Sequence, residues 1–312
     1  MKRFAWKHFK CVIVTRYAFG KTYWKSAKLT AHKNKNRNTF LIVEGMFVRI
    51  ARFRIKPQIL NLLILYRTMV RPGFFCFLLV VFRQRRQAGK YIKELGEYSG
   101  KSENEVRRLF YDEEVAENVW RRVKPETEEE ILRFYAETEE CLFSNLRWHA
   151  LDTQKFTSRF MLADFCRRHK VKTVLDYGGG AGEYCIFLSK NGLDVTYCDV
   201  YGVPWKFSKW RFERRGLPVK MLRANQDKLG KYDLILCTDV LEHVKNPLKV
   251  LSELHDALNM NGYLCATFPF SYPKEQHLFE NRKYANTIEK DLVEMGFRFV
   301  EEDYLKYYKK QR

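Results

Sequence analysis

The sequence predicts an α/β fold in which helices cover both faces of a doubly wound, mostly parallel sheet. Three features of the C-terminal half indicate it. Short apolar strands alternate with helical segments, a glycine-rich turn joins the first of these strands to its helix, and a carboxylate follows each of the first two strands. At 312 residues, the chain is long enough for one sizeable core and an extension.

The first strand and its turn lie in residues 171–182, V-K-T-V-L-D-Y-G-G-G-A-G. The apolar pair Val174 and Leu175 suits a buried parallel strand. The turn that follows has the spacing D-x-G-x-G-x-G, formed by Asp176, Gly178, Gly180 and Gly182. The dinucleotide pattern G-x-G-x-x-G and the phosphate-loop pattern both fail here. Glycine allows a ligand to approach the backbone closely, and a helix (183–190) begins directly afterwards.

The second strand, 195–198, is followed by Asp199. A carboxylate at the tip of this strand can accept hydrogen bonds from both hydroxyls of a ribose. The alternative is a strand–helix–strand unit that binds no nucleotide, in which Asp199 caps a loop.

The later elements continue the alternation. Asn246-Pro247 begins a helix with Leu258 on its apolar face, and Asn261-Gly262 is expected to end it. The other predicted elements are a helix at 204–215, strands at 219–222, 234–237 and 263–268, a helix at 281–295 and paired edge strands within 297–308.

Residues from about 127 to the C-terminus resemble the class I S-adenosylmethionine-dependent methyltransferases. The resemblance includes residues 232–244, Y-D-L-I-L-C-T-D-V-L-E-H-V, whose ending is similar to ubiquinone-pathway O-methyltransferases and many small-molecule methyltransferases. It implies a Rossmann-like fold with one antiparallel strand, S-adenosyl-L-methionine as cofactor, and O- or N-methylation of a small-molecule or lipid-like acceptor. The cofactor-binding residues that it implies are Asp176, Gly178, Gly180, Gly182, Asp199, Asn225 and Thr238.

In this branch the loop 238–244 faces both cofactor and acceptor. His243 is therefore the first candidate for a catalytic base, because an ordinary imidazole pKa of about 6.5 suits proton removal near neutrality. Its alternative role is a packed histidine bonded to backbone. His277, just after the fifth strand, is the second candidate. The family's N-terminal helical lid could bring four side chains toward the acceptor, although the simpler interpretation of each is a packing or surface residue: Tyr135, Arg147, Trp148 and His149.

The residues Asp239, Glu242 and His243 form D-x-x-E-H, which resembles an E-x-x-E-H arrangement that some relatives use to hold a divalent metal. These side chains can share one helix face. However, Asp239 is one methylene shorter than the glutamate of that pattern. We therefore predict no metal site, with Asp239 facing the cofactor and Glu242 bracing the loop, and keep the metal site as the alternative.

Charge divides the chain. Residues 1–90 hold 21 Lys and Arg and a single acid, Glu44, whereas the remainder holds 36 basic and 36 acidic residues. We predict a basic, partly apolar extension (1–88), a helical lid (89–150) and a cofactor-binding domain (151–312). Thr127 with Glu130, and Ser102 with Glu105, are capping-box patterns that begin lid helices. A further helix is predicted at 153–169.

Within the extension, two apolar runs, 59–66 and 74–82, flank Arg67, Arg71 and Pro72. This pattern is typical of a broken helix in a membrane interface that binds anionic lipid. The alternative is a helical hairpin packed on the catalytic domain.

The basic arm also allows RNA methylation guided by electrostatics, but the neutral catalytic part argues against a nucleic-acid substrate. A non-catalytic cofactor-binding scaffold at a membrane is the third possibility. The eight cysteines contain no C-x-x-C pair, and no signal peptide is recognisable, so we expect a cytoplasmic protein, or one peripheral to a membrane.

Overall fold

A computed structural model describes residues 32–33, 39–43, 46–49 and 72–311. The chain divides into two compact units, 1–83 and 84–312, and each is considered by itself. In the first unit, β1 (His32–Lys33), β2 (Thr39–Val43) and β3 (Met46–Arg49) form an antiparallel sheet in that order. The first predicted apolar run, with Arg67 and Arg71, lies outside the described residues.

Helix α3 (Pro72–Ser99) begins in the first unit and continues into the second. It contains the second predicted apolar run and the predicted boundary at residue 88. Among the helices that the described residues form, none combines the length and the apolarity needed to cross a membrane.

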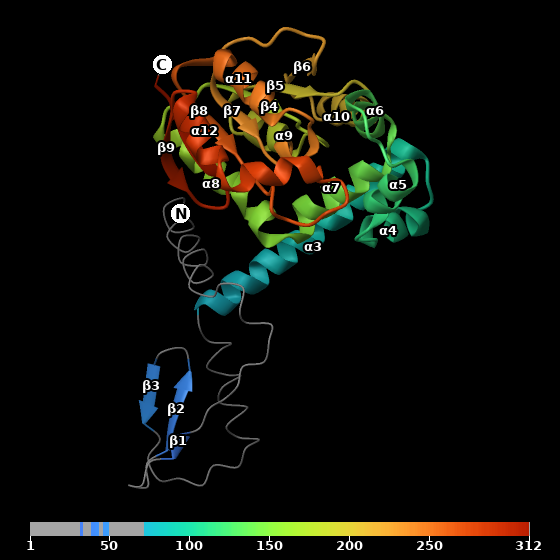
Figure 1. The fold of residues 1–312 in the computed structure, drawn as a ribbon. Coiled ribbons are helices and arrows are strands. Elements are labelled where there is room, and N and C mark those ends of the chain that lie inside the picture. Colours follow the sequence, from blue (N-terminus) through green and yellow to red (C-terminus); the bar gives the residue numbers. More distant parts are fainter. Residues whose placement is uncertain (1–31, 34–38, 44–45, 50–71, 312) are drawn as a thin grey trace. The chain divides into compact units, whose positions relative to one another are not determined.

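The second unit is built around a seven-stranded sheet with the order β6-β5-β4-β7-β8-β10-β9 (Figure 1). The strands are β4 (Thr173–Tyr177), β5 (Asp194–Asp199), β6 (Lys220–Arg223), β7 (Tyr232–Cys237), β8 (Leu258–Ala266), β9 (Phe297–Glu302) and β10 (Lys306–Lys310). The neighbours from β6 to β8 are parallel, and β10 is antiparallel to both β8 and β9. The predicted Rossmann-like, doubly wound sheet is confirmed.

Apolar clusters cover both faces of this sheet. Leu175 belongs to a cluster that includes Leu251 of α11 (Pro247–Ala257) and Leu292 of α12 (Ile288–Glu294). Its neighbour Val174 points to the opposite cluster, which contains side chains of α8 (Thr153–Arg168) and α9 (Glu183–Ser189). Because successive strand residues face opposite sides, a strand buried on both faces must be apolar throughout.

The remaining helices precede the sheet or connect its strands. They are α4 (Glu103–Tyr111), α5 (Val115–Val123), α6 (Glu128–Glu137), α7 (Glu140–Leu151), α10 (Val203–Glu213) and the 3₁₀ helices η1 (Leu241–His243) and η2 (Phe279–Asn286). The capping box of Thr127 and Glu130 is confirmed at α6. At α4, the Ser102 side chain accepts the predicted hydrogen bond from the Glu105 N–H.

Two predicted helices differ from the structure, one in its end and one in its continuity. The helix that begins at Pro247 ends at Ala257, and Leu258 is already the first residue of β8, where it pairs with Tyr232. Asn261 adopts φ 64° within that strand, next to an irregularity in the pairing of β7 with β8. A left-handed Asn before Gly is thus part of a strand irregularity here and not of a helix cap. The helix predicted at 281–295 is divided into η2 and α12 at Thr287.

Candidate active site

The glycine-rich turn between β4 and α9 requires its glycines for conformation and for packing. Gly178, Gly180 and Gly182 have φ values of 71°, 54° and 72°, which other residues rarely adopt. A Cβ at Gly178 would lie 2.3 Å from a methyl carbon of Val240, and one at Gly182 would lie 2.6 Å from the Phe212 ring. The glycines are therefore required by the turn itself, and the close approach of a ligand to this backbone stays a prediction.

Asp199 at the end of β5 faces this turn. Its Oδ2 accepts a hydrogen bond from the Gly180 N–H at 2.6 Å, and its Oδ1 accepts one from the Val200 N–H at 2.7 Å. Burial raises the pKa of Asp199 to about 6, although both of these bonds oppose the shift. Burial likewise raises the pKa of Asp176 to about 6, and the Cys185 thiol donates to Asp176 at 3.2 Å.

A cleft of about 460 Å³ adjoins the turn and the ends of β4, β5 and β7. This volume lies within the usual range for small-molecule sites. Six of the seven predicted cofactor-binding residues line it: Asp176, Gly178, Gly180, Asp199, Asn225 and Thr238. Gly182 is not among the lining residues and instead forms the N-cap of α9.

The helical lid supplies part of the cleft wall. Tyr135 of α6 and Trp148 and His149 of α7 line the cleft, as expected. Arg147 does not line the cleft, and its guanidinium turns to Glu113 at 3.4 Å, so it is the packing or surface residue that the alternative predicted. Arg147 follows Asn145 by two residues on α7, and Asn145 accepts from the Ala181 N–H at 3.3 Å, so the two point in different directions.

Lys155 is a cleft residue that sequence reasoning missed. Its side chain is 3% exposed, and its Nζ lies 2.5 Å from Asp239 Oδ2 and 3.4 Å from Thr238 Oγ1. Burial alone would lower the pKa of Lys155, but the charge of Asp239 outweighs it and raises that pKa. Asp239 is therefore held by α8 and does not join Glu242 and His243, which corrects the D-x-x-E-H set. The sequence feature that could have indicated this role was a single lysine among the apolar positions of the segment that forms α8.

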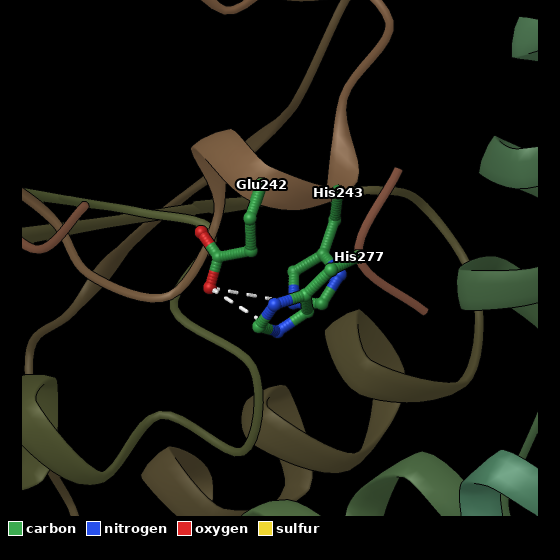
Figure 2. Close-up of side chains that lie close together, drawn as sticks. All are labelled: Glu242, His243 and His277. Atoms are coloured by element: carbon green, nitrogen blue, oxygen red, sulfur yellow. Dashed lines mark ion pairs between the residues drawn. The ribbon is translucent and has the colours of Figure 1, made fainter. Parts of the chain in front are cut away.

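His277 joins the other two residues instead (Figure 2). Glu242 and His243 belong to η1, and His277 lies in the loop between β8 and η2. Glu242 Oε1 lies 3.6 Å from His243 Nε2 and 4.0 Å from His277 Nε2. Both histidines line the cleft.

The surroundings of these histidines favour the neutral form. Burial, together with the neighbouring His277, lowers the pKa of His243 to about 4, so the ordinary value that the sequence suggested is wrong. Burial also lowers the pKa of His277. The opposite shift occurs at Glu242, whose pKa is raised well above its usual range by burial and then by the charge of Asp239.

A buried charge network supports the turn from behind. Arg211 of α10 is 1% exposed and contacts Glu94 Oε2 of α3 at 3.0 Å and Glu183 Oε2 of α9 at 3.1 Å. It also donates to the carbonyl of Ala181, next to Gly180. Arg159 of α8 contacts the other oxygen of Glu183 at 2.7 Å. These contacts connect the helical lid to the start of α9, and no local pattern in the sequence indicated them.

Comparison with known proteins points to one enzyme class. The family described as "Methyltransferase domain" matches residues 147–307. The ubiquinone biosynthesis O-methyltransferase of Shewanella pealeana is 30% identical over 98 residues, which are 30% of this chain and 42% of that protein. The corresponding protein of Histophilus somni is 28% identical over 102 residues, which are 30% of this chain and 43% of that protein. The chain thus spans less than half the length of these curated relatives.

Among solved structures, an S-adenosylmethionine-dependent methyltransferase from Clostridium acetobutylicum aligns with a TM-score of 0.43 at 12% identity. The alignment covers 53% of this chain and 96% of that one.

Proposed function

Because the chain belongs to the class I S-adenosylmethionine-dependent methyltransferases, we propose that it methylates a hydroxyl group of a small-molecule or lipid-like acceptor. One observation carries this proposal. The cleft that contains Gly180 and Asp199 continues without a break to Tyr135, His243 and His277. A donor bound at the turn and an acceptor bound among these aromatic side chains would share one cavity. The O-methyltransferase names of the curated relatives support oxygen as the acceptor atom.

Bound S-adenosylmethionine supplies the electrophilic methyl group. In the proposed reaction the bond from this methyl carbon to sulfur breaks as its bond to the acceptor oxygen forms, and the hydroxyl proton leaves. The protein's part is to align the two reactants and exclude water. We assign the ribose hydroxyls to Asp199, the close backbone contacts to Gly178 and Gly180, and the exclusion of water to Tyr135 and Trp148 of the lid.

The proposed reaction also needs a group that accepts the proton of the acceptor hydroxyl. His243 and His277 are neutral at pH 7 and can accept it, but the lowered pKa of His243, about 4, makes it a weak base. A weak base removes a proton efficiently only from an acidic group. A phenol-like hydroxyl, with a pKa of about 10, therefore suits this cleft better than an aliphatic alcohol.

We also propose that residues 1–88 bring the cytoplasmic chain to an anionic membrane surface. The support is the charge of residues 1–90, with 21 basic side chains against a single acid. A surface-bound enzyme would take a lipid-like acceptor directly from the bilayer. Guidance of RNA by the same arm is the competing outcome.

A transfer assay tests the acceptor class. The full-length chain is incubated with methyl-labelled S-adenosylmethionine and with phenolic, lipid, sugar and RNA fractions, and Gly180→Val serves as the control that should not bind the donor. We expect label in a phenolic or lipid product. Label in RNA alone would contradict the proposal in favour of the RNA alternative. Donor binding without transfer to any fraction would favour a non-catalytic scaffold.

A further inference from the structure

Lys274 lies in the loop between β8 and η2 and lines the cleft, together with Trp148 of the lid. Its Nζ lies 4.6 Å from the centroid of the Trp148 ring and 6.0 Å from the centroid of the Tyr272 ring. An aromatic face attracts a cation in this position. The Lys274 side chain is 25% exposed, so its ammonium group is largely shielded from solvent although it borders the cavity.

Within the part of the chain that the structure describes, Lys274 has no close anionic partner. Its ion pair with Glu117 spans 3.9 Å from Nζ to Oε1, which is longer than a hydrogen bond. Glu117 does not line the cleft, and it also pairs with Arg121 at 3.9 Å. By contrast, the ammonium of Lys155 lies 2.5 Å from Asp239, which neutralises it. The charge of Lys274 is therefore available to a ligand in the cleft.

The other charged residues of the cleft do not neutralise Lys274. Several of them are exposed, where water and salt screen their charges: Glu128, Lys245, Lys249 and Glu253. Among the shielded acids, Asp176 and Asp199 belong to β4 and β5, at the end of the cleft that we assign to the donor, and Asp239 is paired with Lys155. Lys274 therefore remains as a shielded positive charge at the acceptor end.

The same turn holds Lys274 and His277. The His277 N–H donates to the Lys274 carbonyl at 3.1 Å, and His277 Nδ1 lies 2.8 Å from the Tyr272 carbonyl. A carbonyl oxygen can only accept, so Nδ1 carries the hydrogen and Nε2 of the neutral ring is the atom that can accept a proton. Burial is the first cause of the lowered pKa of His277, and the charge of Lys274 lowers that pKa further. One short turn thus presents a cation and a proton acceptor to the cleft.

We propose that Lys274 binds the reacting oxygen of the acceptor and stabilises it as a phenolate, so that the substrate is a phenol that reacts as its anion. This inference rests on the proposed function. In the first step the phenolic O–H bond breaks, the proton goes to His277 Nε2, and the Lys274 ammonium binds the oxygen that keeps the electron pair. That pair then forms the bond to the methyl carbon as the methyl–sulfur bond breaks, which yields a methyl ether and S-adenosylhomocysteine.

A histidine by itself is too weak a base for this step. The pKa of a phenol, about 10, exceeds the ordinary imidazole pKa by more than three units, and the lowered pKa of His277 widens the difference. An opposite charge within about 4–6 Å of an acid lowers the pKa of that acid by about 1–3 units. The effect is larger where protein replaces water. Lys274 therefore offsets much of the difference for a phenol, but not for an aliphatic alcohol, which is far less acidic.

The ionisation of 4-nitrophenol measures this effect without methyl transfer, because its phenolate is yellow and its neutral form is not. The full-length chain is saturated with S-adenosylhomocysteine, and the absorbance of bound 4-nitrophenol is titrated with pH. We expect the pKa of the bound phenol to lie about one unit or more below that of the free compound. Lys274→Met should remove this shift, and Lys274→Arg should keep it. The matched control is Lys283→Met, which should behave like the wild type, because Lys283 also lies over a ring, at 5.0 Å from that of Tyr284, but is exposed and does not line the cleft.

Three results would overturn the role of Lys274. They are a wild-type chain that binds S-adenosylhomocysteine but not 4-nitrophenol, a bound phenol whose pKa is the same as in solution, and a shift that Lys274→Met retains in full. Binding of S-adenosylhomocysteine by each variant reports that it is folded, and Lys274→Gln is the substitute if Lys274→Met is not. A phenol pKa that is lowered through Lys274, in a chain that methylates no fraction, would contradict only the proposed function.

Discussion

Replacing Arg211 with methionine should destabilise the whole second unit, because this side chain joins three elements around the glycine-rich turn. Arg211 is 1% exposed and contacts Glu94 of α3 at 3.0 Å and Glu183 of α9 at 3.1 Å. Methionine retains much of the apolar stem but leaves these two buried carboxylates with one arginine partner fewer. It also removes the donor to the carbonyl of Ala181.

The expected loss of stability follows from the ion-pair partners that Glu183 and Glu94 keep when Arg211 is replaced. Removing one partner of a buried ion pair costs about 3–5 kcal/mol. Glu183 keeps Arg159 at 2.7 Å and Glu94 keeps Arg215, so we expect the lower end of that range, about 3 kcal/mol. For a unit of this size that corresponds to a fall in Tm of about 6–12 °C. Affinity for S-adenosylmethionine should fall as well, since the turn loses a support.

The stabilisation that Arg211 provides should depend on pH, with a sign set by the pKa of Glu183. Burial raises the pKa of Glu183, but Arg159 and Arg211 outweigh it and hold that pKa below its ordinary value. A carboxyl with a lowered pKa in the folded state stabilises the fold at neutral pH, and this contribution is lost as the pH falls through the lowered pKa. The stability difference between the wild type and Arg211→Met should therefore narrow in acid.

Denaturant and thermal unfolding, followed by circular dichroism, measure this difference. The matched control is Arg214→Met, whose side chain is 45% exposed and paired with Glu97. An exposed pair of this kind is worth about 0–1 kcal/mol. If Arg211→Met is no more destabilising than Arg214→Met, the buried network does not support the fold as argued.

Three further predictions concern ligand and surface binding. Asp199→Ala should weaken S-adenosylmethionine by about 2–4 kcal/mol in calorimetry. Because the pKa of Asp199 is raised to about 6, wild-type affinity should hold above that pH and fall up to about tenfold per unit below it, and equal affinity at pH 5 and 8 would refute the ionised role. Gly180→Val should abolish binding, since φ is 54° and a Cβ would lie 3.0 Å from Asn145, and wild-type affinity would disprove the close approach. The full-length chain should sediment with anionic vesicles and release in salt, unlike a chain that begins near residue 89, and retention of RNA but not vesicles would contradict the membrane proposal.

Local sequence determined the strand–turn–helix unit that holds the cofactor. Gly178 and Gly180 could be recognised because their left-handed backbone conformations are a property of the turn itself. The strands could be recognised because a strand buried on both faces is largely apolar until it reaches the cleft. Asp199 is the last residue of β5, whereas β4 continues through Asp176 to Tyr177, beyond the predicted break. The start of the lid helix α6 could be predicted from the capping box at Thr127, because the hydrogen bonds of a capping box lie within one helical turn and so depend on local sequence alone.

Tertiary structure alone decided which charged side chains meet. Lys155 is 84 positions from its partner Asp239, and His277 meets Glu242 although α11 and β8 lie between them in the chain. Such contacts depend on how the helices dock on the sheet, so neither the hydrophobic periodicity nor the motif spacing of the sequence predicts them. Some local signals are also ambiguous: Asn261-Gly262 supports a helix end and a strand irregularity equally well, because both need the same left-handed backbone. The pairing of β7 with β8 selects the second, because Leu258 is already bonded into the sheet.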